Sequence, residues 1–355
     1  MNPRDDAAGP PSPAADAAGD AARGATDRRR LEQELARYRD CANVHDLPAI
    51  FHYWSNRYAL PKLIACGFAD LDGFFLSYLV GIGREEPRRL HAVASVGAGN
   101  CDLEVRLATV ARERGVDNLH FHCLELNPHM VERGRRLADR AGLADRFSFE
   151  VTDADAWRPA GPLSACIANH SLHHLVRLER LFGGVRDALG ERGVFLINDM
   201  IGRNGHLRWP EALAAVEEIW RRLPERYKYN HQLRRLEHEF SDWDCAAEGN
   251  EGIRAQDVLP LLIETFHFDS FIAFGNVIDV FVDRSFGHNF DPGVPEDVAW
   301  IDEIARLDEE LLDRGEIKPT HLIAAARARP GASPRCYRHW TPEFCVRRPD
   351  PGAGP

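Results

Sequence analysis

Apolar residues in this chain gather in short runs that alternate with longer helical patterns. In the clearest case, an apolar run at residues 92–96 breaks at a glycine turn, Gly97-Ala98-Gly99. After the turn, leucine and valine recur on one face of residues 103–110. This order predicts a buried strand, a tight turn and a helix whose free N–H groups face the same space as the turn.

The same alternation continues along the chain. A short apolar strand pattern recurs before or after helical segments, which is typical of an α/β fold with a largely parallel sheet. A long helix with apolar residues facing inward is predicted at residues 295–314. The further predicted strands are residues 118–124, 147–151, 163–168, 193–197, 268–274 and 320–326.

The glycine turn indicates a nucleotide-like ligand, and two acidic residues narrow the choice. Asp102 stands where dinucleotide-binding folds have their third glycine, and its charge would repel a pyrophosphate while suiting an ammonium group. Glu125 ends the second predicted strand, the position from which such folds hold a ribose diol. A carboxylate accepts hydrogen bonds from both hydroxyls. A nicotinamide-dependent oxidoreductase stays open as an alternative, although Asp102 speaks against it.

Five motifs in order resemble the class I S-adenosylmethionine-dependent methyltransferases. They are VGAGNCDLE, CLELN, VTDADAW, ANHSLHHL and GVFLINDM, each at the end or start of a predicted strand between residues 90 and 200. The resemblance implies a Rossmann-like doubly wound, mostly parallel seven-stranded sheet with an antiparallel last strand. It implies S-adenosyl-L-methionine as cofactor. The candidate cofactor-binding residues are Gly97, Ala98, Gly99, Asp102, Glu125, Leu126, Asp153, Ala154, Asn169 and His170.

The chemistry is expected after the fourth strand, where His173 and His174 are the candidate catalytic residues. Methyl transfer from a sulfonium needs mainly positioning and exclusion of water, and a histidine base helps when the acceptor is a hydroxyl. Each histidine is also consistent with a capping or packing role. No metal site is expected, because the chain has no HExxH pattern and its HxH, residues 120–122, lies inside the second strand.

Residues 202–266 are predicted to form a helical cap insert after the fifth strand. An insert at the carboxyl edge of a parallel sheet lies where ligands bind. A polar and aromatic cluster at residues 226–232 suggests contact with the acceptor, and the candidate substrate-binding residues are Tyr229, His231 and Arg254. The alternative is that these helices only extend the core. The aromatic segment 51–58 is likewise either a lid over the cofactor or core packing.

Composition sets the remaining expectations. The net charge is −11 and the sequence pI about 5.8, which disfavours nucleic acid and anionic membranes as partners. Eight cysteines without a CxxC pair indicate a reduced, cytoplasmic protein. The sequence has no run of about 18 apolar residues, so no transmembrane helix is predicted. The predicted regions are a disordered segment 1–28, a helical region 29–90, the methyltransferase domain 91–329 and a loose tail 330–355.

The function expected from the sequence is therefore methyl transfer from S-adenosylmethionine to a small-molecule acceptor, at oxygen, nitrogen or carbon. A methyltransferase-like fold acting as a non-catalytic binding module stays open as a second alternative.

Overall fold

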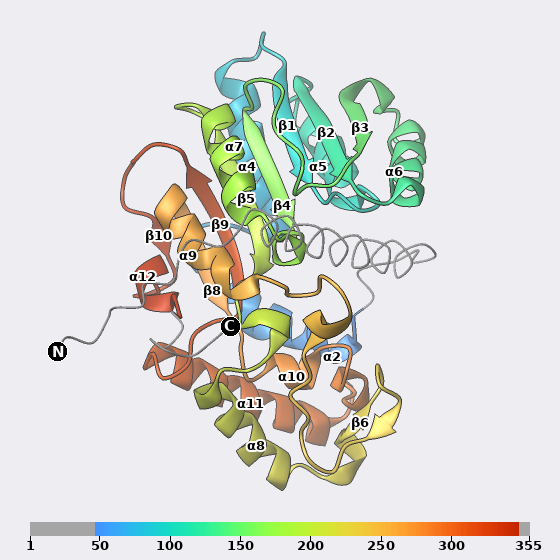
Figure 1. Ribbon diagram of the computed structural model, residues 1–355, viewed down its shortest axis with the longest axis vertical. Helices are drawn as coiled ribbons and strands as arrows, with labels where there is room; N and C mark the ends of the chain where they lie inside the picture. The colour runs from blue at the N-terminus through green and yellow to red at the C-terminus, as the bar shows by residue number, and fades with distance from the viewer. Residues whose placement is uncertain (1–46, 348–355) are drawn as a thin grey trace, which may run out of the picture.

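The computed structural model describes residues 47–347, so the predicted disordered segment 1–28 and the first part of the helical region lie outside the described residues. Its centre is an eight-stranded sheet in the order β10-β8-β9-β5-β4-β1-β2-β3 (Figure 1). The strands are β1 (His91–Val96), β2 (Leu119–Glu125), β3 (Phe147–Val151), β4 (Ala165–Asn169), β5 (Val194–Met200), β8 (His267–Phe274), β9 (His321–Arg327) and β10 (Arg335–Cys336).

The strand directions confirm the predicted doubly wound fold. β1 to β5 pair in parallel, whereas β9 runs antiparallel to both of its neighbours, β5 and β8. Seven strands therefore form the expected sheet with its antiparallel last long strand. The two-residue β10 adds an eighth strand, parallel to β8, which the sequence did not predict.

Helices cover both faces of the sheet because its strands are apolar on both sides. On one face, Val93 and Phe121 pack with α4 (Leu71–Glu85), α5 (Asp102–Glu113) and α6 (Pro128–Arg140). On the other face, Phe195 packs with α7 (Leu178–Leu189) and α9 (Ala255–Thr265). The carboxyl ends of the parallel strands are left uncovered by these helices, and a second group of helices lies beyond them (Figure 1).

This second group, called the cap below, is assembled from three parts of the chain rather than from one insert. The predicted insert 202–266 contributes α8 and a short hairpin to the cap. Its last helix, α9, instead packs against α7 and is one of the helices that cover the sheet. The segment after β8 supplies two more helices, and α2 comes from the N-terminal side. The cap elements are α2 (Ala49–Trp54), α8 (Pro210–Arg222), β6 (Tyr229–Asn230), β7 (Arg235–Leu236), α10 (Asp279–Val282) and α11 (Pro295–Asp313).

The aromatic segment 51–58 serves mainly to dock the N-terminal helices, α2, a π-helical turn (Ser55–Ala59) and α3 (Leu60–Ala65), onto the cap. The hydroxyls of Tyr53 and Tyr58 both donate to Asp302 of α11, at 2.9 Å each. Trp54 is buried in the core. Tyr53, Trp54 and Tyr58 therefore serve in packing. Phe51 of the same segment lines the cavity described below.

The C-terminal segment, predicted to be loose from residue 330, is packed as far as residue 347. Trp340 is 1% exposed, and its indole N–H donates to Asp313 Oδ1 at 3.2 Å. The short helix α12 (Pro342–Cys345) follows it. Packing of Trp340 in the core, with Tyr337 and Phe344 beside it, therefore fixes this Pro-, Gly- and Arg-rich segment. Residues 348–355 lie outside the described part.

Two further findings concern the described residues 47–347. None of their helices is both long enough and apolar enough to cross a membrane. All seven cysteines among them are free thiols.

Candidate active site

A cavity of about 1230 Å³ lies between the carboxyl ends of the parallel strands and the cap. Its wall includes all ten candidate cofactor-binding residues, which come from the connections after β1, β2, β3 and β4. Parallel strands end at one edge of the sheet, so residues as far apart in sequence as Gly97 and His170 meet there. The volume exceeds the range of about 300–1,000 Å³ typical of a site for one small ligand.

The glycine turn after β1 uses its two glycines for different purposes. A Cβ at Gly97, whose φ is +65°, would lie 2.6 Å from the Cβ of Ser171, so this glycine lets the turn pack against the segment after β4. A Cβ at Gly99, whose φ is +56°, would meet no atom within 4 Å. Gly99 therefore borders open space in the cavity. Because it has no side chain, a ligand can approach the backbone of the turn directly.

Glu125 is held in place at the end of β2 by the backbone. Its Oε2 accepts from the N–H of Gly99 at 2.9 Å, and its Oε1 accepts from the N–H of Asn127 at 2.8 Å. Each carboxylate oxygen has a second lone pair. The carboxylate is thus oriented by two backbone donors while it lines the cavity, which is the arrangement expected of a residue that receives ribose hydroxyls.

The region around the turn is acidic. Asp102 begins α5 with an exposed side chain that lines the cavity. Behind it, Glu104 is 2% exposed and accepts from Ser95 Oγ at 2.6 Å, and burial raises its pKa to about 7. Sequence reasoning missed Glu104, although its spacing with Ala108 and Ala111, on a buried face of α5, was a signal of burial.

After β4 the chain makes a strained turn that points histidines at the cavity. His170 has a φ of +52°, a conformation that non-glycine residues seldom adopt and that is concentrated at functional sites. The 3₁₀ turn η3 (Leu172–His174) follows. Asn169 lies beside it, its side-chain oxygen accepting from Asn198 Nδ2 at 2.7 Å.

One buried carboxylate, Asp199 near the end of β5, organises this turn. It is fully buried and accepts from the N–H groups of Ser171 at 2.8 Å and Leu172 at 2.7 Å. Its Oδ1 also lies 2.6 Å from His173 Nδ1. Burial alone would raise the pKa of the Asp199 carboxyl, but His173 and the backbone donors hold that pKa below its ordinary range.

His173, a candidate general base, is a doubly bound imidazole. Its Nδ1 faces Asp199, and its Nε2 lies 3.3 Å from Glu251 Oε1. Burial would lower its pKa, but the two carboxylates outweigh burial and raise the pKa to about 10. A histidine protonated at neutral pH has no lone pair to accept a proton, so this environment does not support the predicted general-base role in the protein alone.

His174 is the better placed of the two candidate catalytic residues. Its side chain is 17% exposed and lines the cavity, and its ring centroid lies 4.2 Å from that of His173. Its Nε2 is 3.9 Å from Glu251 Oε2.

Of the three candidate substrate-binding residues, Tyr229 and His231 are in ring contact, with centroids 5.1 Å apart, but only His231 lines the cavity. His231 lines the cavity at the cap and contacts Asn289 Oδ1 at 2.9 Å. Tyr229 is absent from the wall and has 40% of its surface exposed. Arg254 is also absent from it, because its guanidinium pairs with Glu179 and Asp257, both at 2.7 Å, and ties α9 to α7. Both carboxylates belong to helices of the fold, so the structure gives the assignment of Arg254 to the substrate no support.

Sequence reasoning also missed two groups in the wall of the cavity. Glu251, in the loop before α9, lies 2.9 Å from His206 Nε2. Separately, His321 of β9 lies 3.3 Å from Asp279. No local pattern marks either pair, since the partners are 45 and 42 residues apart.

The sheet order defines a Rossmann-like α/β fold, and the cavity lies at the carboxyl edge of its parallel strands. No protein-family model matches the sequence, and no curated protein matches it significantly.

Among solved structures, the chain is similar to an O-methyltransferase of a trans-AT polyketide synthase from Brevibacillus brevis in complex with S-adenosyl-L-homocysteine. That likeness has 16% identity, 73% coverage of each chain and a TM-score of 0.40. Geranyl diphosphate C-methyltransferase from Streptomyces coelicolor A3(2), in complex with Mg²⁺, geranyl diphosphate and S-adenosyl-L-homocysteine, gives 11% identity, 71% and 79% coverage and a TM-score of 0.39. With TM-scores below 0.5, neither likeness decides what this chain does.

Proposed function

We propose that this protein transfers the methyl group of S-adenosylmethionine to a small-molecule acceptor. The observation that carries the proposal is the convergence of ten residues, from Gly97 to His170, on one cavity. All ten belong to sequence motifs at the ends of separate predicted strands. The volume of about 1230 Å³ leaves room for an acceptor beside the cofactor.

The wall suits this cofactor better than a dinucleotide. Gly99 leaves an open space beside the turn, and Glu125 presents an oriented carboxylate to a ribose diol. Asp102 and Asp153 add negative charge on the same side. A negative field favours the ammonium and sulfonium of S-adenosylmethionine and disfavours a pyrophosphate, which speaks against the nicotinamide-dependent alternative.

The residues of the chain have three tasks in such a reaction. The cofactor supplies an activated methyl group on sulfur, and the glycine turn with Glu125 positions it. The cap covers the carboxyl edge and limits access of water. His174 is the residue we assign as general base where the acceptor is a hydroxyl, while an amine or a carbon acid needs its own proton removed by the same or another group.

Replacing Glu125 by alanine should weaken binding of S-adenosylhomocysteine by about 1–3 kcal/mol, the scale of a buried hydrogen bond to a charged group. Calorimetric titration of the folded variant measures this. Glu150→Ala, on the neighbouring strand β3 and outside the cavity wall, is the matched control and should leave the affinity unchanged. Equal affinities for both variants would sink the assignment of Glu125 to the ribose.

Replacing Asp102 by asparagine tests the identity of the ligand through the sign of the effect. Loss of this exposed charge should lower the affinity for S-adenosylmethionine about two- to fivefold, because exposed charges interact modestly. The same change should raise the affinity for NAD, since it removes the repulsion between Asp102 and a pyrophosphate. Side-by-side titrations of both ligands decide the matter. Tighter binding of NAD than of S-adenosylmethionine to the unmutated protein overturns the proposed function.

Turnover separates an enzyme from a binding module. The protein should transfer a labelled methyl group from S-adenosylmethionine to at least one component of a metabolite extract, detected by its mass shift. Tight cofactor binding without any labelled product across extracts would favour the non-catalytic alternative.

A further inference from the structure

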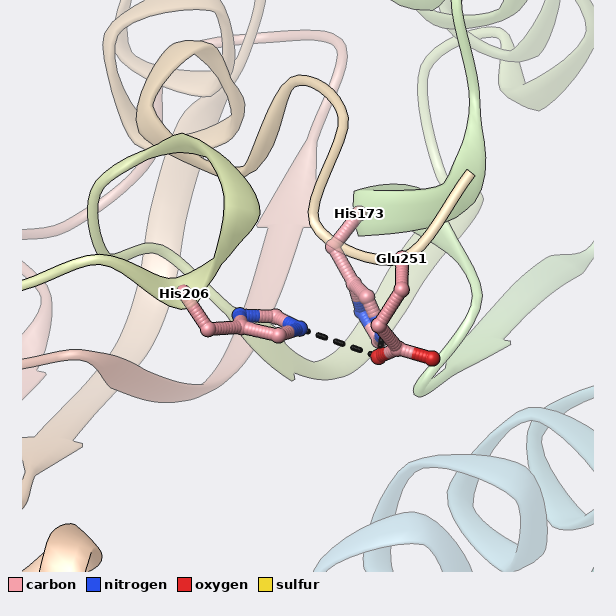
Figure 2. Close-up of side chains that lie close together, drawn as sticks. All are labelled: His173, His206 and Glu251. Atoms are coloured by element: carbon pink, nitrogen blue, oxygen red, sulfur yellow. Dashed lines mark hydrogen bonds and ion pairs between the residues drawn. The ribbon is translucent and has the colours of Figure 1, made fainter. Parts of the chain in front are cut away.

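Three side chains of types that commonly ligate metals meet at the wall of the cavity. His173, His206 and Glu251 each offer one donor atom, and these atoms all lie within 4.8 Å of one another. Figure 2 shows the two imidazoles and the carboxylate pointing toward one another from three separate segments of the chain. No metal-binding pattern in the sequence predicts this group, because its members are 33 and 45 residues apart.

The distances approach those of a coordination shell. Glu251 Oε1 lies 2.9 Å from His206 Nε2 and 3.3 Å from His173 Nε2. Donors bound tetrahedrally at the usual metal–nitrogen and metal–oxygen lengths are about 3.3–3.5 Å apart. The two histidine nitrogens, at no more than 4.8 Å, would close by at most about 1.5 Å to share one ion.

His173 carries the support that metal-binding histidines usually have. A ligating imidazole commonly donates its other N–H to a carboxylate, which fixes the tautomer and the ring orientation. Here Asp199, fully buried, lies 2.6 Å from Nδ1 and leaves Nε2 directed at Glu251.

The backbone holds the other two residues together. The N–H of Gly205 donates to the carbonyl of Gly252 at 2.9 Å, which ties the residue before His206 to the residue after Glu251. A Cβ on Gly252 would lie 3.0 Å from the His206 ring, so glycine is needed for this approach. The two segments are further joined by reciprocal hydrogen bonds between Asn204 and Gln256, at 3.2 and 3.3 Å.

We propose that His173, His206 and Glu251 bind a divalent first-row transition-metal ion at the cavity wall. Two imidazoles and one carboxylate are a donor set suited to Zn²⁺ or Fe²⁺. Three protein ligands leave coordination positions open, and all three residues line the cavity. A metal with an open position polarises an oxygen of a bound molecule. It follows, resting on the proposed function, that the acceptor presents an oxygen donor to this ion.

The competing interpretation is an ion-pair network alone, in which a protonated His173 lies between two carboxylates. Calorimetric titration of chelator-treated protein with Zn²⁺ distinguishes the two. One ion should bind per chain, and His206→Ala and Glu251→Gln should each weaken binding at least about 100-fold, as expected for loss of a direct ligand. His288→Ala, a histidine in the same wall but outside the group, should change the affinity by less than about twofold.

Failure to take up zinc stoichiometrically overturns the proposal, and so does an equal loss in the His288 variant. X-ray absorption of the zinc-loaded unmutated protein needs no variant and should show two imidazole ligands; fewer than two also overturns it. Titration with S-adenosylhomocysteine in the same preparations keeps the two proposals apart. Zinc binding without cofactor binding would contradict the proposed function and leave the metal site standing.

Discussion

Replacing Asp199 by asparagine should lower the free energy of unfolding by about 3–5 kcal/mol, the cost of breaking a buried ion pair by removing one partner. The carboxylate is fully buried and faces the N–H groups of Ser171, Leu172 and Met200 as well as the ring of His173. Asparagine keeps one acceptor oxygen and turns an NH₂ toward donors. Urea denaturation at pH 7, followed by circular dichroism, measures the loss.

The matched control is Asp187→Asn. This aspartate also pairs with a basic residue, Arg186, at 3.0 Å, but its side chain is 72% exposed. An exposed pair contributes little, so the control should change the stability by less than about 0.5 kcal/mol. Similar small losses for both variants would show that Asp199 does not organise the turn after β4.

Replacing Gly99 by valine should leave the protein folded. It should lower the affinity for S-adenosylhomocysteine at least about 100-fold, which corresponds to about 2.7 kcal/mol of binding free energy. The new side chain would extend into the open part of the cavity, where a Cβ meets no protein atom within 4 Å. It therefore costs no packing but occupies the space we assign to the cofactor. Calorimetry gives the affinity, and thermal melting confirms the fold.

Valine at a positive φ also strains the backbone, and Gly115→Val controls for that strain. Gly115 has a φ of +78° and equally open surroundings, but it lies outside the cavity wall. Both variants should lose comparable stability, and Gly115→Val alone should retain cofactor affinity. If both variants lose affinity alike, the effect arises from the backbone and the cofactor does not occupy the space beside Gly99.

The sheet and the proposed cofactor-binding residues could be predicted from the sequence because local residue patterns mark them. The long strands are rich in apolar residues, either continuous or alternating with polar ones, and the candidate residues stand at or just after the ends of such segments. Glu125 is an example: its position at the end of β2 follows from the run that precedes it. Once the strands are parallel, geometry brings their ends to one edge without further information.

The other side of the cavity was inaccessible for the opposite reason. Glu251 lies in a turn-rich loop without periodicity, and its approach to His206 depends on the tertiary placement of both segments. The burial of Asp199 depends on the turn that it itself organises. Arg254 was chosen from the sequence as a charged residue near a binding edge, and its partners, Glu179 and Asp257, could not be predicted from the sequence.

The two-residue strand β10 has a consequence for how molecules of this protein meet one another. It pairs with β8 at Ser270 and Phe271, both fully buried, on the side of β8 that faces away from β9. An uncovered sheet edge offers its backbone groups to a strand of another chain and so promotes aggregation. β10 therefore occupies the backbone groups of β8 at these two residues, and a strand of only two residues replaces a longer edge, which we expect to leave less backbone open to pairing with a neighbouring molecule.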